Sequence, residues 1–158
     1  MNPRQLEQAL ELSNIRTSLV AYRDAAQKSK WYIRFFVPGL DGRYNPGVAV
    51  VSSSKVDKLI DALNKAYKKM ELLEEEKYTG EFSEDFVLRG EVSDTLSVTV
   101  SSKKSYILFW SYKKIRLHFL VSSKTNTFSR SFDSNDVKTT INILSSAENL
   151  AAKLIKQL

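Results

Sequence analysis

The chain has 158 residues, of which 42% are hydrophobic and 27% are charged, and it carries a formal net charge of +6. This is the composition of one ordinary globular domain, which excludes a disordered or collagen-like chain. The absence of cysteine excludes disulfides, thiolate nucleophiles and zinc–thiolate sites, and the single histidine, His118, excludes a multi-histidine metal site.

The basic and acidic residues are unevenly distributed along the chain. Residues 95–132 contain seven lysines or arginines and no carboxylate, whereas residues 71–94 contain nine carboxylates and two basic residues. A strongly basic stretch favours a polyanionic partner such as nucleic acid. No apolar run approaches the roughly 20 residues of a membrane-spanning helix, and the first residues do not resemble a signal peptide. We therefore expect an intracellular protein without a membrane partner.

The first segment, up to about Gln27, has the signals of an amphipathic helix. Asn2 and Pro3 resemble an N-cap followed by proline at the first helical position. Apolar side chains then recur every three or four residues, at Leu12, Ile15, Leu19, Tyr22 and Ala26. We predict a helix that packs within the domain. The same stripe is also suited to pairing two copies as a homodimer.

Residues 31–37, Trp-Tyr-Ile-Arg-Phe-Phe-Val, have the aromatic and β-branched content of a strand. Tyr32, Arg34 and Phe36 share one face, because successive side chains on a strand point to opposite faces. Two rings beside an arginine suit stacking on unpaired bases, although such rings also pack under helices. A loop rich in Gly and Pro, residues 38–47, follows and carries Arg43, and residues 48–51 return as a short strand.

A second helix is predicted from Ser52 to about Gly80. Residues 52–54, all serine, followed by Asp57 resemble a capping box, and Gly80 is a candidate C-terminal cap. Lysines lie mostly on its solvated side. Its apolar stripe consists of Val56, Leu59, Ile60, Leu63, Ala66, Tyr67, Met70 and Leu73.

The acidic connection, residues 71–94, has three interpretations. The simplest is a solvated link in which residues 86–88 begin the sheet and Gly90 forms a bulge or turn. The second is a segment that shields the basic sheet until a polyanion displaces it. The third is a carboxylate cluster that binds Mg²⁺ for phosphodiester hydrolysis, with the members Glu81, Glu84, Asp85 and Glu91.

Residues 95–132 alternate between apolar and polar side chains, which is the pattern of strands in an antiparallel meander. Leu96, Val98 and Val100 share one face of the first strand. Both faces of residues 106–112 are apolar or aromatic, as suits a central strand covered on both sides or a strand with one aromatic face left for a ligand. The turns are predicted at residues 101–105, 112–114 and 122–127.

A capping cluster, Asp133 to Asp136, precedes a final helix over residues 134–157. Its apolar stripe is Val137, Ile141, Leu144, Ala147, Ala151, Leu154 and Leu158. We predict a single domain over residues 1–158, with an α-β-β-α arrangement in residues 1–80 followed by the acidic connection, the basic meander and this helix. The fold class is α+β, an antiparallel β-meander sheet covered on one face by amphipathic helices.

The open face of this sheet, aromatic and basic, is the expected working surface. In broad topology it is similar to single-strand-binding folds built from a β-meander and a packing helix, such as the Whirly and PC4-like families. We expect a protein that binds single-stranded DNA or RNA by stacking and phosphate neutralisation, without a cofactor. The expected binding residues are Tyr32, Arg34, Phe36, Arg43, Lys103, Lys104, Tyr106, Trp110, Tyr112, Lys113, Lys114, Arg116, Lys124 and Arg130.

Two other classes stay open on the sequence. One is a metal-dependent nuclease that uses the four carboxylates of the acidic connection, assisted by a lysine or His118. The other is a structural protein that self-associates through its helices or its aromatic face. No catalytic motif supports an enzyme, and a lone histidine on a strand is more typical of a sheet surface than of a catalyst, so a binding protein is the main expectation.

Overall fold

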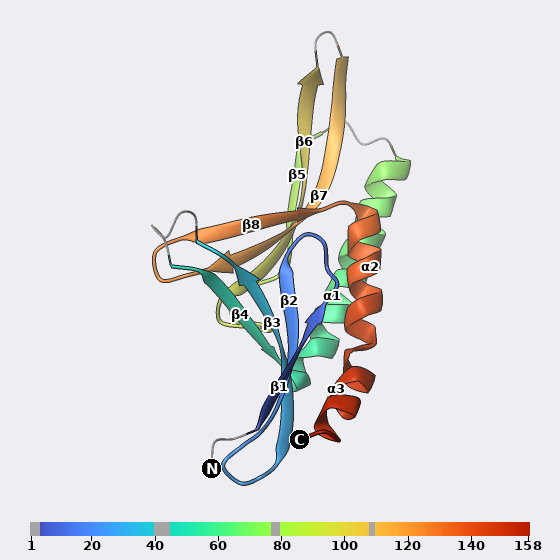
Figure 1. Ribbon diagram of the computed structural model, residues 1–158. Coiled ribbons are helices and arrows are strands. Elements are labelled where there is room, and N and C mark those ends of the chain that lie inside the picture. Colours follow the sequence, from blue (N-terminus) through green and yellow to red (C-terminus); the bar gives the residue numbers. More distant parts are fainter. Residues whose placement is uncertain (1–3, 40–44, 77–79, 108–109) are drawn as a thin grey trace.

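The structure, a computed structural model, describes residues 4–39, 45–76, 80–107 and 110–158 (Figure 1). Its fold is α+β, as the sequence predicts. The elements in chain order are β1 (Gln5–Leu10), β2 (Arg16–Arg23), β3 (Ser29–Val37), β4 (Gly47–Ser52), α1 (Ser53–Glu75), β5 (Phe82–Val87), β6 (Leu96–Ile107), β7 (Trp110–Ser122), β8 (Thr127–Phe132), α2 (Ser134–Ser145) and α3 (Ala147–Ile155).

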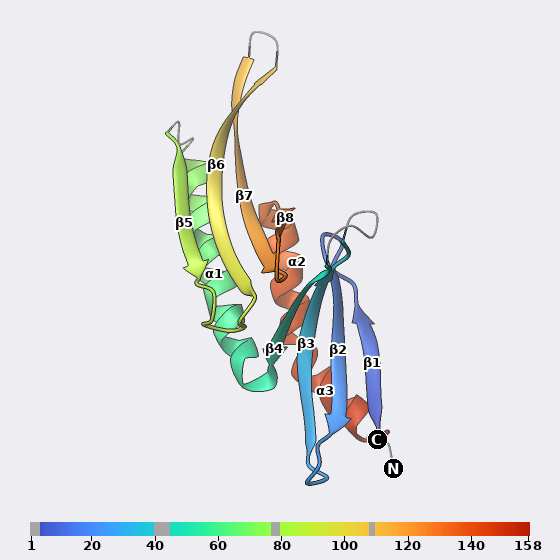
Figure 2. The same ribbon diagram turned by 90° about the vertical axis from the view of Figure 1, so that its left-hand side faces the viewer.

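The described strands form two antiparallel meanders rather than one. The first sheet has the strand order β1-β2-β3-β4, and the second sheet has the order β5-β6-β7-β8. Each meander is followed by helix, so the chain runs four strands and α1, then four strands and the α2–α3 pair. Figure 2 shows the two sheets next to each other with the helices behind them. The prediction of a meander covered by helices is confirmed, but it applies twice.

The helices and the inner faces of both sheets enclose one hydrophobic core. Helix α1 packs against α2 and against strands of both sheets, while α3 packs on β2 and β3. Phe119 of β7 lies at the centre, with its ring centroid 5.3 Å from that of Phe35 on β3 and 4.8 Å from that of Phe132 on β8. All three side chains are buried. The two meanders therefore share their interior.

The two sheets also meet directly where β4 begins. A Cβ atom on Gly47 would lie 2.9 Å from Cδ2 of Phe128 and 3.2 Å from the carbonyl oxygen of Val121, which is too close for any side chain without movement. Beside it, the hydroxyl of Thr95 donates a 2.6 Å hydrogen bond to the carbonyl of Val48. A glycine at this position lets the second sheet approach the backbone of β4.

The helix predicted over the first 27 residues is wrong, because this segment forms β1 and β2. Residues 17–21 are buried without a break. The reason is that β2 lies between β1 and β3, and side chains on both of its faces are covered. Continuous burial hides the two-residue period of a strand, and Leu12, Ile15 and Leu19 then mimic a helical stripe. The homodimer inferred from that stripe loses its basis, and the predicted cap at Asn2 and Pro3 lies outside the described residues.

Two of the three turns predicted in the basic meander are also wrong. Residues 101–105 lie inside β6, and residues 112–114 lie inside β7. These strands pair with each other from Leu96–Val121 to Ile107–Trp110, and they extend past the ends of their neighbours β5 and β8. We call the extension, residues 103–107 and 110–114, the arm; it projects from the second sheet in Figure 1. The third turn is confirmed between β7 and β8, where Ser123 N–H donates to the carbonyl of Asn126 at 2.7 Å.

The helix ends follow local chemistry in part. Asp133 and Asp136 form the predicted capping box of α2, with the Asp136 N–H 2.8 Å from the Asp133 carboxylate. Helix α1 begins at the predicted serines without a side-chain cap, and it ends at Glu75 rather than at Gly80. Gly90 has a φ of +95° in the β5–β6 connection, as a turn glycine does. None of the described helices is both long and apolar enough to cross a membrane.

The shared core makes a direct prediction for stability. We expect Phe119→Ala to lower the free energy of unfolding by about 3–5 kcal/mol, because the cavity opens between both sheets. Urea denaturation followed by circular dichroism measures this loss. The control is Leu88→Ala, since Leu88 is 56% exposed and its truncation should change stability by less than about 0.5 kcal/mol. Equal effects of the two substitutions would contradict the assignment of the core.

Candidate nucleic-acid interface

The outer face of the first sheet, opposite the helices, carries a row of aromatic and cationic side chains. On β2 and β3 the cross-strand pairs facing this side are Arg16–Phe36, Ser18–Arg34, Val20–Tyr32 and Tyr22–Lys30. Consecutive pairs are separated by roughly 6.8 Å along the strands. We define the aromatic row as Arg16, Tyr22, Tyr32, Arg34 and Phe36. Two strands thus place rings and guanidinium groups in one line.

Four members of the aromatic row contact one another in two pairs. The rings of Tyr22 and Tyr32 meet edge to face with centroids 5.8 Å apart, and the guanidinium of Arg16 lies 5.4 Å from the centroid of Phe36. Arg34 forms an ion pair with Glu7 of β1, and its side chain keeps 32% of its surface exposed. Arg16 is exposed, and the three rings are half-buried. Each ring therefore packs on the sheet yet keeps part of its surface in solvent.

A carboxylate holds the β2–β3 turn at one end of the aromatic row. Oδ1 of Asp24 accepts hydrogen bonds from the backbone N–H groups of Ala26 and Lys28, both at 2.9 Å, and Oδ2 lies 3.2 Å from the ammonium of Lys30. The bond from Lys28 is the largest cause that lowers the pKa of Asp24 from its ordinary value of 3.8. Gln27 takes a φ of +62° in the same turn. The charged form of Asp24 fixes the chain between Tyr22 and Lys30.

Outside the arm, the described side chains on the outer face of the second sheet are mainly polar. His118 of β7 joins three strands, with Nε2 3.0 Å from the Ser101 hydroxyl on β6 and Nδ1 3.4 Å from the Ser129 hydroxyl on β8. The hydroxyl of Thr99 donates to the carboxylate of Asp85 at 2.7 Å. Arg116 lies on this face, opposite Ser101 in the ladder. These contacts tie the strands together, which agrees with a structural role for the single histidine.

The arm concentrates four lysines at the level where it leaves the second sheet. In the β6–β7 ladder Lys103 is directly opposite Lys114, and Lys104 is directly opposite Lys113. Like charges on directly opposite residues destabilise an antiparallel pair. The ladder continues to Ser105–Tyr112, Tyr106–Ser111 and Ile107–Trp110, but the side chains of residues 103–107 and 110–113 lie outside the described part. Of the four lysines, Lys114 is the one whose side chain is described, and it is exposed.

The predicted binding residues do not gather on one face. Tyr32, Arg34 and Phe36 lie on the first sheet, whereas Arg116 and the arm belong to the second. Lys124 is exposed in the β7–β8 turn. Arg130 pairs with Phe119 in register, so it shares the core-facing side of β8 and reaches a cleft next to Phe36. Arg43 lies outside the described residues.

Sequence reasoning missed Arg16 and Tyr22 in the aromatic row because it assigned their segment to a helix. The β-branched residues Thr17 and Val20 between them were the available signal for a strand. Each is buried in β2. Glu7, the partner of Arg34, was missed for the same reason.

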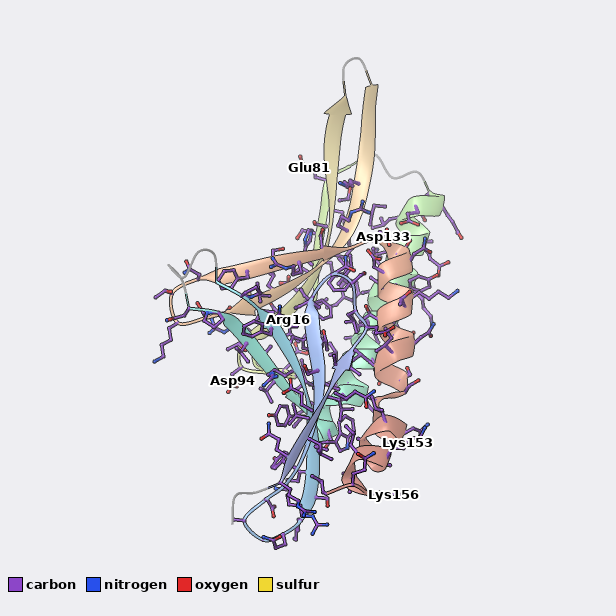
Figure 3. The ribbon with its side chains drawn as sticks, in the orientation of Figure 1. Arg16, Glu81, Asp94, Asp133, Lys153 and Lys156 are labelled. Atoms are coloured by element: carbon purple, nitrogen blue, oxygen red, sulfur yellow. The ribbon has the colours of Figure 1, made fainter. Side chains whose placement is uncertain are left out.

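The carboxylates of the nuclease hypothesis do not converge. Glu84 and Asp85 are neighbours on β5 and so point to opposite faces, Glu81 precedes that strand, and Glu91 lies in the connection after it. Figure 3 shows Glu81 near one end of β5 and Asp94, a later residue of the acidic connection, near the other. Among the described residues, no group of three or more potential ligands is close enough to hold a metal ion. The placement of these four carboxylates therefore does not support metal-dependent hydrolysis.

Comparisons with known proteins do not add a relative. No protein-family model matches this chain, and searches of curated proteins and of solved structures return no match. The functional argument therefore depends on the geometry of the chain itself.

The β2–β3 turn gives a pH-dependent prediction. Because the folded state lowers the pKa of Asp24, the turn is fully stabilised above the ordinary carboxyl pKa and loses that stabilisation as the pH falls through the lower folded value. We expect the amide chemical shifts of Ala26 and Lys28 to titrate together below about pH 4, in an NMR series from about pH 6 to about pH 2. In Asp24→Asn this shared transition should vanish. Its persistence in that variant would assign the transition to another group.

Proposed function

We propose that this protein binds single-stranded nucleic acid inside the cell, with the aromatic row as the platform on which bases stack. The observation that carries the proposal is the line of half-exposed rings and guanidinium groups on the helix-free face of the first sheet. Tyr22, Tyr32 and Phe36 supply flat apolar surfaces, and Arg16 and Arg34 supply positive charge beside them. Stacking on such surfaces tolerates any base sequence, because every base has a π-face.

The same arrangement predicts a preference for single strands. Bases in a duplex are already stacked on one another, whereas unpaired bases can turn onto aromatic side chains. Stacking and phosphate neutralisation use features common to DNA and RNA, so we expect both to bind. The Arg34–Glu7 ion pair would be exchanged for an Arg34–phosphate contact in the complex, which adds to the salt dependence of affinity.

The arm supports a polyanionic partner independently. Its lysines stand opposite one another in a two-stranded extension, and an isolated two-stranded hairpin is marginal in water. Consecutive pairs face opposite sides of the arm, so a phosphate backbone lying along one side would reduce the repulsion within the lysine pair on that side. We assign the arm an electrostatic role, which steers the strand to the protein and contributes to affinity.

The aromatic row is tested by truncating its rings. We expect Tyr32→Ala and Phe36→Ala each to weaken binding of a fluorescent single strand of about 20 nucleotides by roughly 1–3 kcal/mol, measured by anisotropy at low salt. Tyr67→Ala, a tyrosine truncation on α1, should leave affinity unchanged. Wild-type affinity in both row variants, with folding verified by circular dichroism, would refute stacking on this face. Loss of the probe in Mg²⁺ that EDTA prevents would instead favour the nuclease.

The arm is tested by its effect on salt dependence. We expect replacement of Lys103, Lys104, Lys113 and Lys114 by alanine to reduce the slope of log affinity against log salt by up to about 3, since each phosphate contact on a single strand contributes about 0.7. The matched control replaces four exposed lysines of α1: Lys55, Lys58, Lys65 and Lys68. A control that lowers the slope as much as the arm variant would show that only net charge matters.

A third test uses the ion pair. Glu7→Gln releases the guanidinium of Arg34 and removes a negative charge from the edge of the aromatic row. We expect it to tighten single-strand binding about two- to fivefold at low salt, an electrostatic gain of the size typical for an exposed pair. Glu148→Gln, an exposed carboxylate at the start of α3, is the control. Weaker binding of Glu7→Gln would place the strand elsewhere.

A further inference from the structure

A cleft with two arginines lies at the end of the aromatic row marked by Phe36. Its volume is about 390 Å³, and its walls come from the β1–β2 connection, the end of β3 and the middle of β8. Arg16, Phe36, Pro38 and Arg130 line it. Figure 3 shows Arg16 where the first sheet approaches β8. The cleft therefore joins the aromatic row to the second sheet.

Hydrogen bonds across the sheets hold its walls in place. The side-chain amide of Asn14 donates to the carbonyl of Ser131 at 2.7 Å and to the carboxylate of Asp136 at 3.3 Å. Next to Asn14, the side chain of Ile15 is buried in the shared core. These contacts hold the β1–β2 connection against β8 and the start of α2. Arg16 and Arg130, more than a hundred residues apart in sequence, are thereby fixed on one cavity.

Among the described residues that line the cleft, the charged ones are all arginines. Its described lining includes both arginines and no carboxylate. Asp136, the acidic group behind the wall, is already engaged by Asn14 and by the backbone N–H of Asp133 at 3.1 Å. Arg130 donates one Nη1 hydrogen bond, 3.1 Å long, to the carbonyl of Ser129, and Arg16 presents its guanidinium over the Phe36 ring. Each guanidinium has five N–H donors, so donors remain for an anion.

We propose that this cleft binds a phosphomonoester, the terminal phosphate of a single strand lying on the aromatic row. A terminal phosphate carries about −1.5 to −2 charges at neutral pH, whereas a backbone diester carries one. Two guanidinium groups matched to three terminal oxygens favour the more highly charged group, and their planar donors suit phosphate geometry. Phe36, the ring of the aromatic row that also lines the cleft, is placed to stack on the last base. This inference rests on the proposed function.

The test compares strands that differ only at their ends. Internally labelled single strands of about 20 nucleotides carry a 5′-phosphate, a 3′-phosphate or no terminal phosphate, and their affinities are measured by anisotropy at one salt concentration. We expect one phosphorylated strand to bind at least about tenfold more tightly than the unphosphorylated strand, the ratio that one strong charge-assisted contact produces. Inorganic phosphate at constant ionic strength should abolish this ratio without releasing the unphosphorylated strand.

Substitutions locate the preference in the cleft. Arg16→Gln and Arg130→Gln should each reduce the ratio to below about threefold, a loss of most of that one contact. Arg130→Gln should leave the unphosphorylated strand bound with nearly wild-type affinity. Arg89→Gln, an exposed arginine in the β5–β6 connection, is the control for loss of one charge and should keep the full ratio.

Three outcomes would overturn the proposal. Equal affinities for all three wild-type strands would remove the cleft's role while leaving single-strand binding intact. A preference that survives in both arginine variants would place the phosphate site elsewhere. Absence of binding by every strand at low salt would overturn the proposed function, and with it this inference.

Discussion

The packing of Phe119 between Phe35 and Phe132 is the contact on which the molecule depends, because it joins two meanders into one core. Strands have two faces, and here one face of each sheet is committed to the helices and to the other sheet. What remains is a pair of outer faces with different chemistry. The first is aromatic and cationic, and the described part of the second outside the arm carries hydroxyls, His118 and Arg116.

This division explains why the fold class could be predicted from the sequence but the number of sheets could not. The alternation at Leu96, Val98 and Val100 is local, and so is the capping box at Asp133 and Asp136. In β2, however, burial is continuous from Thr17 to Ala21, because neighbouring strands and α3 cover it. Under such cover the sequence loses its period of two, and the helical spacing of Leu12, Ile15 and Leu19 became the stronger signal.

The candidate site was predictable to the same extent. Tyr32, Arg34 and Phe36 share a face because a strand requires it, whatever the tertiary structure. Their neighbours Arg16 and Tyr22 depend on the pairing of β2 with β3. Arg130 and Phe36 line one cleft because the first sheet lies against β8, where Asn14 bonds to Ser131. Such juxtapositions come from tertiary contacts between distant segments, which no local pattern encodes. The lysine pairs of the arm were assigned to turns, because polar residues within a long two-stranded ladder resemble the ends of strands.

The two sheets also differ in where their charged residues lie. The acidic connection, residues 71–94, includes the end of α1 and all of β5, an edge strand of the second sheet where Asp85 accepts a hydrogen bond from Thr99. On the first sheet a single carboxylate, Glu7, restrains a single arginine of the aromatic row. The rings are therefore accompanied by cations at both ends of the row, with Arg16 beside Phe36 and Lys30 opposite Tyr22.

The central claim is that the outer face of the first sheet receives the strand, and an NMR titration of the labelled protein with an unlabelled single strand tests it most directly. We expect the largest amide shift changes at Tyr22, Tyr32, Arg34 and Phe36, with the amides of α1 and α2 unchanged. Changes confined to the helices, or to the second sheet and the arm alone, would contradict the account.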